Sequence, residues 1–453
     1  MKRFILTLVL LLWASIGNGN DIGINDGILR IGGDKPGIQI LDNSLRAYNF
    51  LFNGTLDRVS KTTLPAANYT GAHYNLVNGQ LVTYGANEYV RDGQGRILTF
   101  GAYTQLCLNS EDPSAAGWTT DGTTTPTITS DTASNSGPFL AHRVKSGGSL
   151  SSRYNFWRST ALPASGAPVG VQYVRVYYIS GDSGSIFVSF RNATTAQESY
   201  YSGTIGSASV GAQVAGSLTL ISDTYDSSLG YRTAVLKVNF NTKGDSLTIG
   251  VGPFSATVDK YITILGADVL GGSGSGDIST WRPHVPSSGS VVSVSATKYD
   301  YNGGTPRGPR LALASMPDAI IGLQGTGPGD ASGQIEWAGT PLFSAADIAA
   351  DQNIVVCNET ASLLNFDTTG FEVKDGTNTS TATVAFVKDT GYIVKVPYGP
   401  HPVTKEMKIV VDEESSELGS NDGSFNPDAY VGFGGSDFPV AHTSFKIRKT
   451  PAW

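Results

Sequence analysis

The stretch that decides the fold runs from Tyr231 to Phe240 and reads YRTAVLKVNF. Every second position from 234 onward is apolar, and these positions are Ala234, Leu236, Val238 and Phe240. On the other face, Thr233, Lys237 and Asn239 are polar. Because successive side chains of a β-strand point to opposite faces of its sheet, this alternation predicts a strand with one face in a core and the other toward water.

Other segments between positions 105 and 270 show the same two-residue period. They are Val169 to Ser180, Ile186 to Asn192 and Tyr261 to Leu265, and clusters of Gly, Ser and Asp separate them. Many short alternating segments with turn signals between them are typical of a β-sandwich or jelly roll. The sequence therefore predicts an all-β protein, with a jelly-roll sandwich over residues 105–270.

The composition agrees with an all-β chain of several domains. Glycine accounts for 55 of the 453 residues and charged residues for 15%, against averages of about 7% and about 25%. The 40% of hydrophobic residues suffices for separate cores in two or three domains. The formal net charge is −7 and no run of Lys or Arg occurs, which argues against binding to nucleic acid or to an anionic membrane.

The amino terminus has the pattern of a secretory signal. Lys2 and Arg3 precede an apolar run from Phe4 to Ile16, and small residues follow that run. The run is too short for a comfortable membrane span, and no second stretch of membrane length follows it. We therefore expect a signal peptide over residues 1–20, export of the protein, and no membrane span once the signal is removed.

Two motifs flank the predicted jelly roll. The opening motif consists of Gly79–Leu81, Ala86–Asp92, Leu106–Asp112 (LCLNSED) and Trp118. The exit motif runs from Trp281 to Gly289 and reads WRPHVPSSG. Their order resembles the segments that open and close a jelly-roll domain in many bacteriophage virion proteins, usually tail-fibre or head-fibre components. Gln105 stands where that family often has Asn, so the resemblance concerns pattern and spacing rather than every residue.

The resemblance implies a carbohydrate-binding-module-like jelly roll on a virion surface. It also implies that residues 21–104 form an N-terminal region that attaches the fibre to the particle. The partners would then be other virion proteins and a host-surface polysaccharide. The protein would be located on the virion surface or, after export, outside the cell.

A second β-rich unit is expected at the carboxyl end. Residues 271–306, which are rich in Gly, Ser and Pro, are predicted to be a linker. Strand-like segments with an Asp375-Gly376 turn then fill residues 307–453. The late segment Val431 to Gly435 (VGFGG) resembles a strand of concanavalin A-like (laminin-G-like) sandwiches. This second resemblance implies a lectin-like sandwich.

Catalytic motifs are not evident in the sequence. Concanavalin A-like hydrolases carry Glu-x-Asp-x-x-Glu on one strand, whereas the nearest segment here has Gln334 and Ala338 beside Glu336. The five histidines are scattered, and no pair has the spacing of metal ligands or of a catalytic triad. We therefore expect that the protein is not an enzyme and that it needs no catalytic metal.

Two further features stay open at the level of sequence. Asp-containing turns such as Gly181-Asp182 and Asn421-Asp422 could hold a structural calcium, because Ca²⁺ prefers carboxylate and carbonyl oxygens. Cys107 and Cys357 could form a disulfide in an oxidising compartment, or could be two separate buried thiols.

Sugar binding is the one chemistry with local support in the sequence. Saccharides are recognised by flat aromatic faces together with Arg, Asn or Asp side chains. Two predicted strands carry such residues at alternating positions, and these are Arg153, Asn155 and Trp157 in the first strand and Tyr173, Arg175 and Tyr177 in the second. We expect both strips to lie on the sheet face away from the core, and to form one platform if the strands are neighbours. The alternative is that a loop or another subunit covers them.

The leading hypothesis is a non-enzymatic fibre or tail protein that binds host glycans for adsorption. One alternative is a secreted bacterial glycan-binding protein or polysaccharide-active enzyme, and another is a structural decoration protein without a ligand. We expect a homo-oligomer, with a trimer as the specific prediction, because weak sugar sites gain avidity when several share one stalk.

Overall fold

The computed structural model describes part of the chain. The longer described ranges are 90–120, 125–159, 172–192, 196–213, 215–240, 247–272, 280–294, 333–357, 361–375, 378–400 and 436–448. The shorter ones are 20–25, 28–33, 44–49, 54–56, 73–77, 80–84, 278, 296, 298–302, 305–307, 311–312, 405–407, 409–412, 414–415, 419–420 and 430–434. The predicted signal sequence and the Asn421-Asp422 turn lie outside these residues, apart from position 20.

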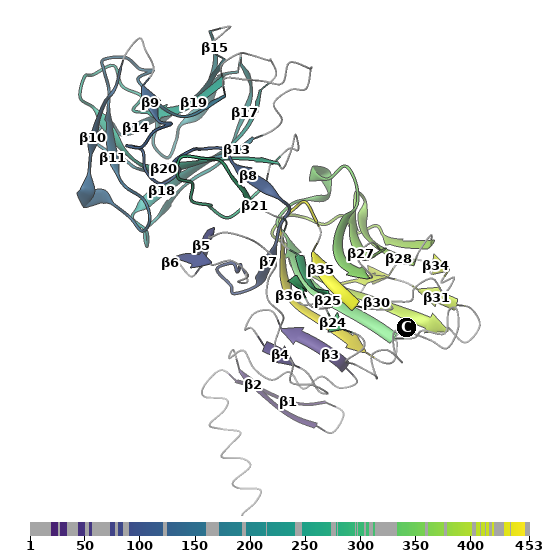
Figure 1. The fold of residues 1–453 in the computed structure, drawn as a ribbon. Coiled ribbons are helices and arrows are strands. Elements are labelled where there is room, and N and C mark those ends of the chain that lie inside the picture. The colour runs from purple at the N-terminus through teal and green to yellow at the C-terminus, as the bar shows by residue number, and fades with distance from the viewer. Residues whose placement is uncertain are drawn as a thin grey trace, which may run out of the picture. The chain divides into compact units, whose positions relative to one another are not determined.

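The chain folds into two compact units, both built from antiparallel β-sheets (Figure 1). The jelly-roll unit comprises Thr70–Ala86 and Ala102–Ala296, and the second unit comprises Met1–Tyr69, Asn87–Gly101 and Thr297–Trp453. Among the described residues the helical elements are two short 3₁₀ turns, η1 (Thr132–Ser134) and η3 (Ala345–Asp347). The predicted all-β fold class is confirmed. Within the described residues, no helix is both long and apolar enough to cross a membrane.

Two sheets form the sandwich of the jelly-roll unit. The eight-stranded sheet has the order β10 (Thr127–Ser130), β11 (His142–Lys145), β20 (Tyr261–Gly272), β13 (Gln172–Ile179), β18 (Tyr231–Phe240) and β17 (Gly216–Asp226). In addition, β8 (Tyr103–Gln105) pairs with β20, and β21 (Val292–Val294) pairs with β8. The six-stranded sheet has the order β16 (Ser209–Gln213), β15 (Gln197–Thr204), β14 (Ser185–Asn192), β19 (Leu247–Gly252), β12 (Tyr154–Ser159) and β9 (Thr119–Thr120). The chain crosses repeatedly from one sheet to the other, as expected for a jelly roll.

The core of this unit takes apolar side chains from both sheets. On β18, Ala234, Leu236 and Val238 are buried in that core, whereas Thr233 and Lys237 on the other face are partly exposed. The alternation read from Tyr231 to Phe240 therefore places the correct side chains inside, up to Val238. Trp118 of the opening motif belongs to this core, where it packs against the rings of Tyr154 and Phe156 and donates from Nε1 to the carbonyl of Asn109 at 2.7 Å.

The opening and exit motifs bind each other at one side of the sandwich. The Ser287 hydroxyl donates to the carbonyl of Cys107 at 2.6 Å and accepts from the Ser110 amide at 3.0 Å. The Gly289 amide donates to the carbonyl of Leu108 at 2.7 Å. These bonds join segments about 180 residues apart in sequence, so the two motifs have a structural role in closing the unit.

The second unit contains two larger sheets and a separate two-stranded one. The first has the order β23 (Thr305–Arg307), β22 (Lys298–Asn302), β35 (Tyr430–Gly434), β26 (Gln352–Cys357), β27 (Ala361–Asp367), β28 (Gly370–Asp375) and β29 (Asn378–Ala382), with β24 (Leu311–Ala312) beside β35. The other has the order β33 (Glu414–Ser415), β32 (Val410–Val411), β30 (Tyr392–Pro400), β25 (Gly333–Pro341), β36 (Val440–Arg448), β3 (Ser44–Asn49) and β4 (Gly54–Leu56), with β31 (Lys405–Met407), β34 (Gly419–Ser420) and β7 (Ile97–Thr99) alongside. The separate pair is β1 (Asn20–Asn25) and β2 (Ile28–Gly33).

The second unit has an aromatic core. Trp337, Phe343, Phe366, Phe371 and Phe386 are buried and contact one another in pairs. His442 joins this core, where its Nδ1 accepts a hydrogen bond from the indole of Trp337 at 3.0 Å. Burial lowers the pKa of His442 to about 3, so the imidazole is neutral at physiological pH.

The unit boundaries differ from the predicted ones. Residues 21–104 were expected to form one N-terminal region, but 70–86 belong to the jelly-roll unit, whereas β3 pairs with β36 and β7 also pairs with β36. Residues 271–306 were expected to be a linker, yet Gly271 and Gly272 continue β20 and β21 pairs with β8. Backbone pairing between distant segments therefore overrides the composition of these stretches.

Of the two possibilities left open for Cys107, the structure shows a free thiol, which is buried in the jelly-roll core. Its Sγ donates to the carbonyl of Phe156 at 3.3 Å, and burial raises the pKa of the thiol well above its usual range. Cys107 therefore behaves as a small core residue.

Candidate functional site

The two predicted sugar-binding strips lie on different sheets. Asn155 and Trp157 lie on β12, which belongs to the six-stranded sheet, and Arg153 directly precedes this strand. Tyr173, Arg175 and Tyr177 lie on β13, which belongs to the eight-stranded sheet. One platform was expected only if the two strands were neighbours, and this condition is not met. All six side chains are at most 8% exposed, so the expectation of open, solvent-facing strips is wrong.

Trp157 lies in the core because β12 contains a bulge. Asn155 pairs with Gly250 on β19, but Trp157 pairs with Ile249, which leaves Phe156 as an extra residue. A bulge of this kind shifts the alternation by one, so the residues after it change faces. Trp157 consequently joins Tyr154 and Phe156 in the core rather than lying beside Arg153 and Asn155.

Arg153 and Asn155 are held within the six-stranded sheet region. The Arg153 guanidinium forms an ion pair with Glu198 and donates to the hydroxyl of Ser189 at 3.3 Å. Asn155 occupies the position opposite Gly250, where an added Cβ would approach its Oδ1 to 2.4 Å. Arg153 and Asn155 are 5% and 6% exposed, so neither presents an open face to solvent.

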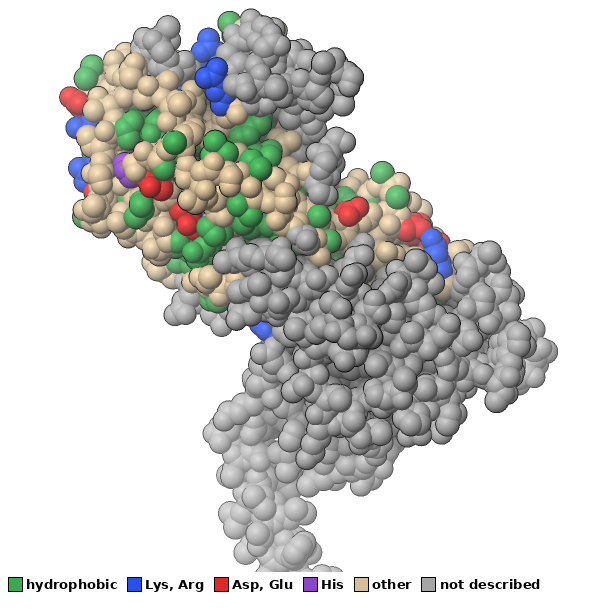
Figure 2. Space-filling view, in the orientation of Figure 1, with side chains coloured by type: hydrophobic (Ala, Val, Ile, Leu, Met, Phe, Trp, Pro, Cys, Tyr) green, Lys and Arg blue, Asp and Glu red, His purple; other side chains and the backbone are tan. Residues whose placement is uncertain are grey.

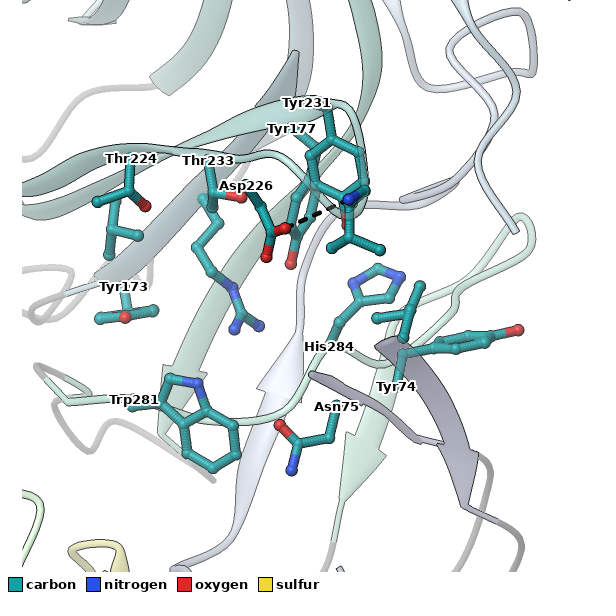
Figure 3. Close-up of a pocket in the computed structure, with 14 residues that line it drawn as sticks. Tyr74, Asn75, Tyr173, Tyr177, Thr224, Asp226, Tyr231, Thr233, Trp281 and His284 are labelled. Atoms are coloured by element: carbon teal, nitrogen blue, oxygen red, sulfur yellow. Dashed lines mark hydrogen bonds between the residues drawn. The ribbon is translucent and has the colours of Figure 1, made fainter. Parts of the chain in front are cut away.

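Tyr173, Arg175 and Tyr177, by contrast, line a pocket on the outer face of the eight-stranded sheet (Figure 3). We call it the sheet pocket, and its volume is about 250 Å³. Its remaining lining residues are Tyr74, Asn75, Leu81, Thr224, Asp226, Leu229, Tyr231, Thr233, Val235, Trp281 and His284. The alternation of side chains along β13 therefore correctly separated these three residues from the core residues Val174 and Val176.

Three separate stretches of chain build the walls of the sheet pocket. Strands β13, β17 and β18 supply the sheet face, the hairpin β5 (His73–Val77) and β6 (Gln80–Tyr84) supplies one side, and the exit motif supplies Trp281 and His284 (Figure 3). The hairpin is attached to the exit motif by two backbone bonds, from the Tyr74 amide to the His284 carbonyl at 2.8 Å and from the His284 amide to the Tyr74 carbonyl at 3.1 Å. The pocket is thus assembled from both flanks of the jelly roll.

A buried ionic network forms next to the pocket around Asp268 on β20. Its Oδ2 accepts hydrogen bonds from Nε of Arg175 and from the hydroxyl of Tyr177, both at 2.7 Å. Its Oδ1 lies 2.5 Å from Nδ1 of His284 and accepts from Nε2 of Gln105 at 2.5 Å. The carboxylate is completely buried but fully surrounded by donors.

The charges in this network stabilise one another. Burial alone would raise the pKa of Asp268, but Arg175 and His284 together hold it well below its usual range. Burial likewise would lower the pKa of His284, yet the Asp268 carboxylate raises it above the ordinary value, and the Nε2 contact to Glu111 at 3.2 Å acts in the same direction. We therefore assign an ionised Asp268 between two cations, Arg175 and His284.

Sequence reasoning missed Asp268, His284 and Glu111 as members of this network. His284 and Glu111 stand within the two motifs, but only the fold brings them together. Asp268 gave a signal that could have been used, because it is an acidic residue inside the apolar run from Ala267 to Leu270. A charged residue in a buried strand requires partners of opposite charge.

Asp226 also lines the sheet pocket, at the end of β17. Its Oδ1 accepts from the amide and hydroxyl of Ser228, at 2.8 and 2.5 Å, and from the amide of Leu229 at 3.2 Å. The hydrogen bond from the Ser228 hydroxyl is the main reason that the pKa of Asp226 is lowered. The group is therefore an ionised carboxylate on the rim of the pocket.

One group of carboxylates in the described part of the chain could hold a metal ion. Oxygens of Asp351, Asp367 and Glu372 in the second unit lie within 4.8 Å of one another. The ammonium of Lys374 already contacts Asp351 at 2.5 Å and Glu372 at 2.9 Å, so one cation offsets part of the negative charge of this group. Asp182, named for the predicted calcium, instead accepts from the amide of Tyr261 at 2.8 Å. A structural calcium stays a prediction.

Glu336, which lies in the segment most similar to the hydrolase motif, is buried on β25 of the second unit. It stands opposite Lys395 on β30 and opposite Lys446 on β36. A glycosidase needs a second carboxyl group at about 5–9.5 Å, whereas the residues facing Glu336 across both neighbouring strands are basic. This register favours a structural role for Glu336.

The comparisons with known proteins add little. No family model matches the sequence, and no curated protein matches it. Among solved structures, the chain is similar to domains LG4-5 of the mouse laminin alpha1 chain, with 12% sequence identity and a TM-score of 0.18. That alignment covers 76% of this chain and 90% of the laminin chain. The likeness is weak, and we draw no functional conclusion from it.

Proposed function

We propose that the jelly-roll unit binds a saccharide in the sheet pocket and does so without catalysis. The observation that carries the proposal is the combination of aromatic rings with hydrogen-bonding groups in one cavity on a sheet face. Tyr173 and Trp281 offer rings, while Asp226 and Asn75 offer polar groups (Figure 3). A pyranose has an apolar face of C–H groups and a rim of hydroxyls, so it matches both kinds of group.

The rigidity of the pocket supports binding. Arg175 and Tyr177 are fixed by Asp268, and His284 is fixed by Asp268 and Glu111. Side chains that are already ordered lose little conformational entropy when a ligand arrives, which favours affinity. The buried network is therefore proposed as the support that orients the pocket-lining side chains.

The acidic groups favour binding over hydrolysis. A glycosidase needs a carboxylic acid whose pKa is raised so that it can donate a proton. In and beside the sheet pocket, however, the pKa values of Asp226 and Asp268 are both lowered. Both groups are ionised at neutral pH, which suits hydrogen-bond acceptors rather than a general acid.

The biological setting follows from the motif resemblance alone. On that basis we propose a virion surface or fibre protein that adsorbs to a host-surface polysaccharide together with other virion proteins. The scattered Lys and Arg side chains on the described surface in Figure 2 fit a glycan partner better than a nucleic acid.

A glycan array tests this proposal. We expect the wild-type protein to bind one or more saccharides, and Trp281→Ala to weaken that binding about tenfold or more, since loss of one well-packed aromatic contact is worth about 1.4 kcal/mol or above. Tyr225→Ala is the control, because Tyr225 is 58% exposed and lies outside the pocket lining. Absence of any binding by the wild type would favour a ligand-free structural protein.

A further inference from the structure

The sheet pocket contains two charged groups with different surroundings. Arg175 donates from Nε to Asp268 at 2.7 Å and from Nη1 to the carbonyl of Arg282 at 2.6 Å. Its positive charge is therefore balanced within the protein by a carboxylate 2.6 Å from Nη2. Nη2 takes part in this ion pair but makes no hydrogen bond to a described residue, so Arg175 is balanced in charge although not all of its N–H groups are used.

The negative charge of Asp226 is not balanced by a described cationic side chain. Its three hydrogen bonds all go to Oδ1, and they come from backbone and hydroxyl donors of Ser228 and Leu229 rather than from a cation. Among the described residues, Asp226 forms no ion pair, and Oδ2 accepts no hydrogen bond. Figure 3 shows its carboxylate turned toward the interior of the pocket, on the side facing the labelled rings.

An ionised carboxylate oxygen in a concave, partly enclosed site selects its ligand by charge. Hydroxyl groups donate to such an oxygen in strong, charge-assisted hydrogen bonds. A second carboxylate at the same place would be repelled, and the repulsion is larger in a pocket than in open water. The lowered pKa of Asp226 agrees with this geometry, since the group keeps its charge at neutral pH.

We propose that the sheet pocket selects a pyranose whose hydroxyls donate to Oδ2 of Asp226, and that it excludes sugars bearing a carboxylate. This inference rests on the proposed saccharide binding and names its substrate class. Asp226 is then the residue that determines specificity, while Tyr173 and Trp281 contact the ring of the sugar.

Matched monosaccharides test the proposal on the full chain. Methyl glycosides of glucose, galactose and mannose would be titrated by calorimetry or by saturation-transfer NMR, each beside its uronic acid and its 2-amino analogue. In the series that binds best, we expect the neutral sugar to bind about tenfold or more tighter than the uronic acid, the scale of one charged hydrogen bond.

Asp226→Asn should weaken binding of the neutral sugar. The affinities of the neutral sugar and the uronic acid should then differ by no more than about threefold, because the negative charge is lost while the shape of the side chain is kept. Asp182→Asn is the control, since Asp182 is partly exposed in another turn of the same unit and pairs with Lys260. This control should leave the ratio unchanged. Melting temperatures of both variants verify that they fold.

The outcomes separate the two claims. Equal or tighter binding of the uronic acid than of the neutral sugar by the wild type would overturn the specificity while leaving saccharide binding in place. Weaker binding of the amino sugar than of the uronic acid would overturn it as well. A ratio unaffected by Asp226→Asn would remove Asp226 as its cause. If no sugar in any series binds at millimolar concentration, the proposed function fails and the specificity fails with it.

Discussion

Single residues show where the alternation of side chains along a strand predicts the buried face correctly and where it does not. Val174 and Val176 on β13 face the core, and Tyr173, Arg175 and Tyr177 face the pocket, as alternation predicts. On β12 the same rule fails at Trp157, because the bulge at Phe156 shifts the register by one. The sequence carries no separate signal for that bulge, since both Phe156 and Trp157 are aromatic residues that a core accepts equally well.

Trp157→Ala should destabilise the jelly-roll unit as a core truncation. We expect the free energy of unfolding to fall by about 3–5 kcal/mol, the usual range for removing a buried Trp. Trp281→Ala removes the same side chain from a partly exposed position and should cost clearly less. Urea denaturation of both variants gives the two values. Equal costs would mean that Trp157 is not a core residue.

His284 makes stability depend on pH. Its pKa in the folded protein is raised by the buried Asp268 carboxylate, so its contribution is complete below the unfolded-state pKa of about 6.5 and is lost as the pH rises through the folded-state pKa. We therefore expect the free energy of unfolding to decline on the alkaline side. His284→Gln, which cannot lose a proton, should be less stable at pH 6 but should show a flatter decline. An unchanged slope would argue against a charged His284.

Asp268 acts at the acidic end of the same range. Its pKa is lowered in the folded protein, so its contribution is present above about pH 3.9 and is lost as the pH falls below that value. Together the two groups place the greatest stability of the network between about pH 4 and 6.5.

Among the elements, the strands themselves could be read from the sequence, but their partners could not. The alternation of β18 and the turn signals identify strands because they reflect local side-chain direction. The contact between the hairpin β5–β6 and the exit motif joins residues such as Tyr74 and His284, which are far apart in sequence. Such pairing depends on the whole fold, so the pocket could not be assembled from local patterns.

The hydrogen bonds between the opening and exit motifs should stabilise the jelly-roll unit. Ser287→Ala removes a hydroxyl that bonds both the Cys107 carbonyl and the Ser110 amide. Because these backbone groups would remain buried without a partner, we expect a loss of about 1–3 kcal/mol in unfolding free energy. Ser293→Ala on β21 is the control, since Ser293 is exposed, and it should change stability by less than about 0.5 kcal/mol. Similar losses of unfolding free energy in the two variants would contradict a stabilising role for these hydrogen bonds.

At the scale of the whole molecule, fold class was predictable and domain boundaries were not. Glycine content and alternation indicate an all-β protein regardless of which strands pair. The boundaries depend on strands such as β3 and β7, which add to the sheet of the second unit although they precede the jelly roll in sequence. Only long-range pairing reveals that assignment.

The oligomeric state stays a prediction at this scale. A saccharide site of small volume gains useful strength when several copies act together, and we expect a trimer on that reasoning. Light scattering at micromolar concentration measures the mass directly. A monomer would contradict this prediction without affecting the pocket itself.

The central claim is that the outer face of the eight-stranded sheet holds a saccharide. The most direct test is a crystal structure of the protein with the strongest ligand from the glycan array, in which the position of the sugar is observed. We predict a pyranose in the sheet pocket, in contact with Trp281 and Tyr173 and within hydrogen-bonding distance of Oδ2 of Asp226. A sugar found on the six-stranded sheet or in the second unit, with the sheet pocket empty, would contradict the account.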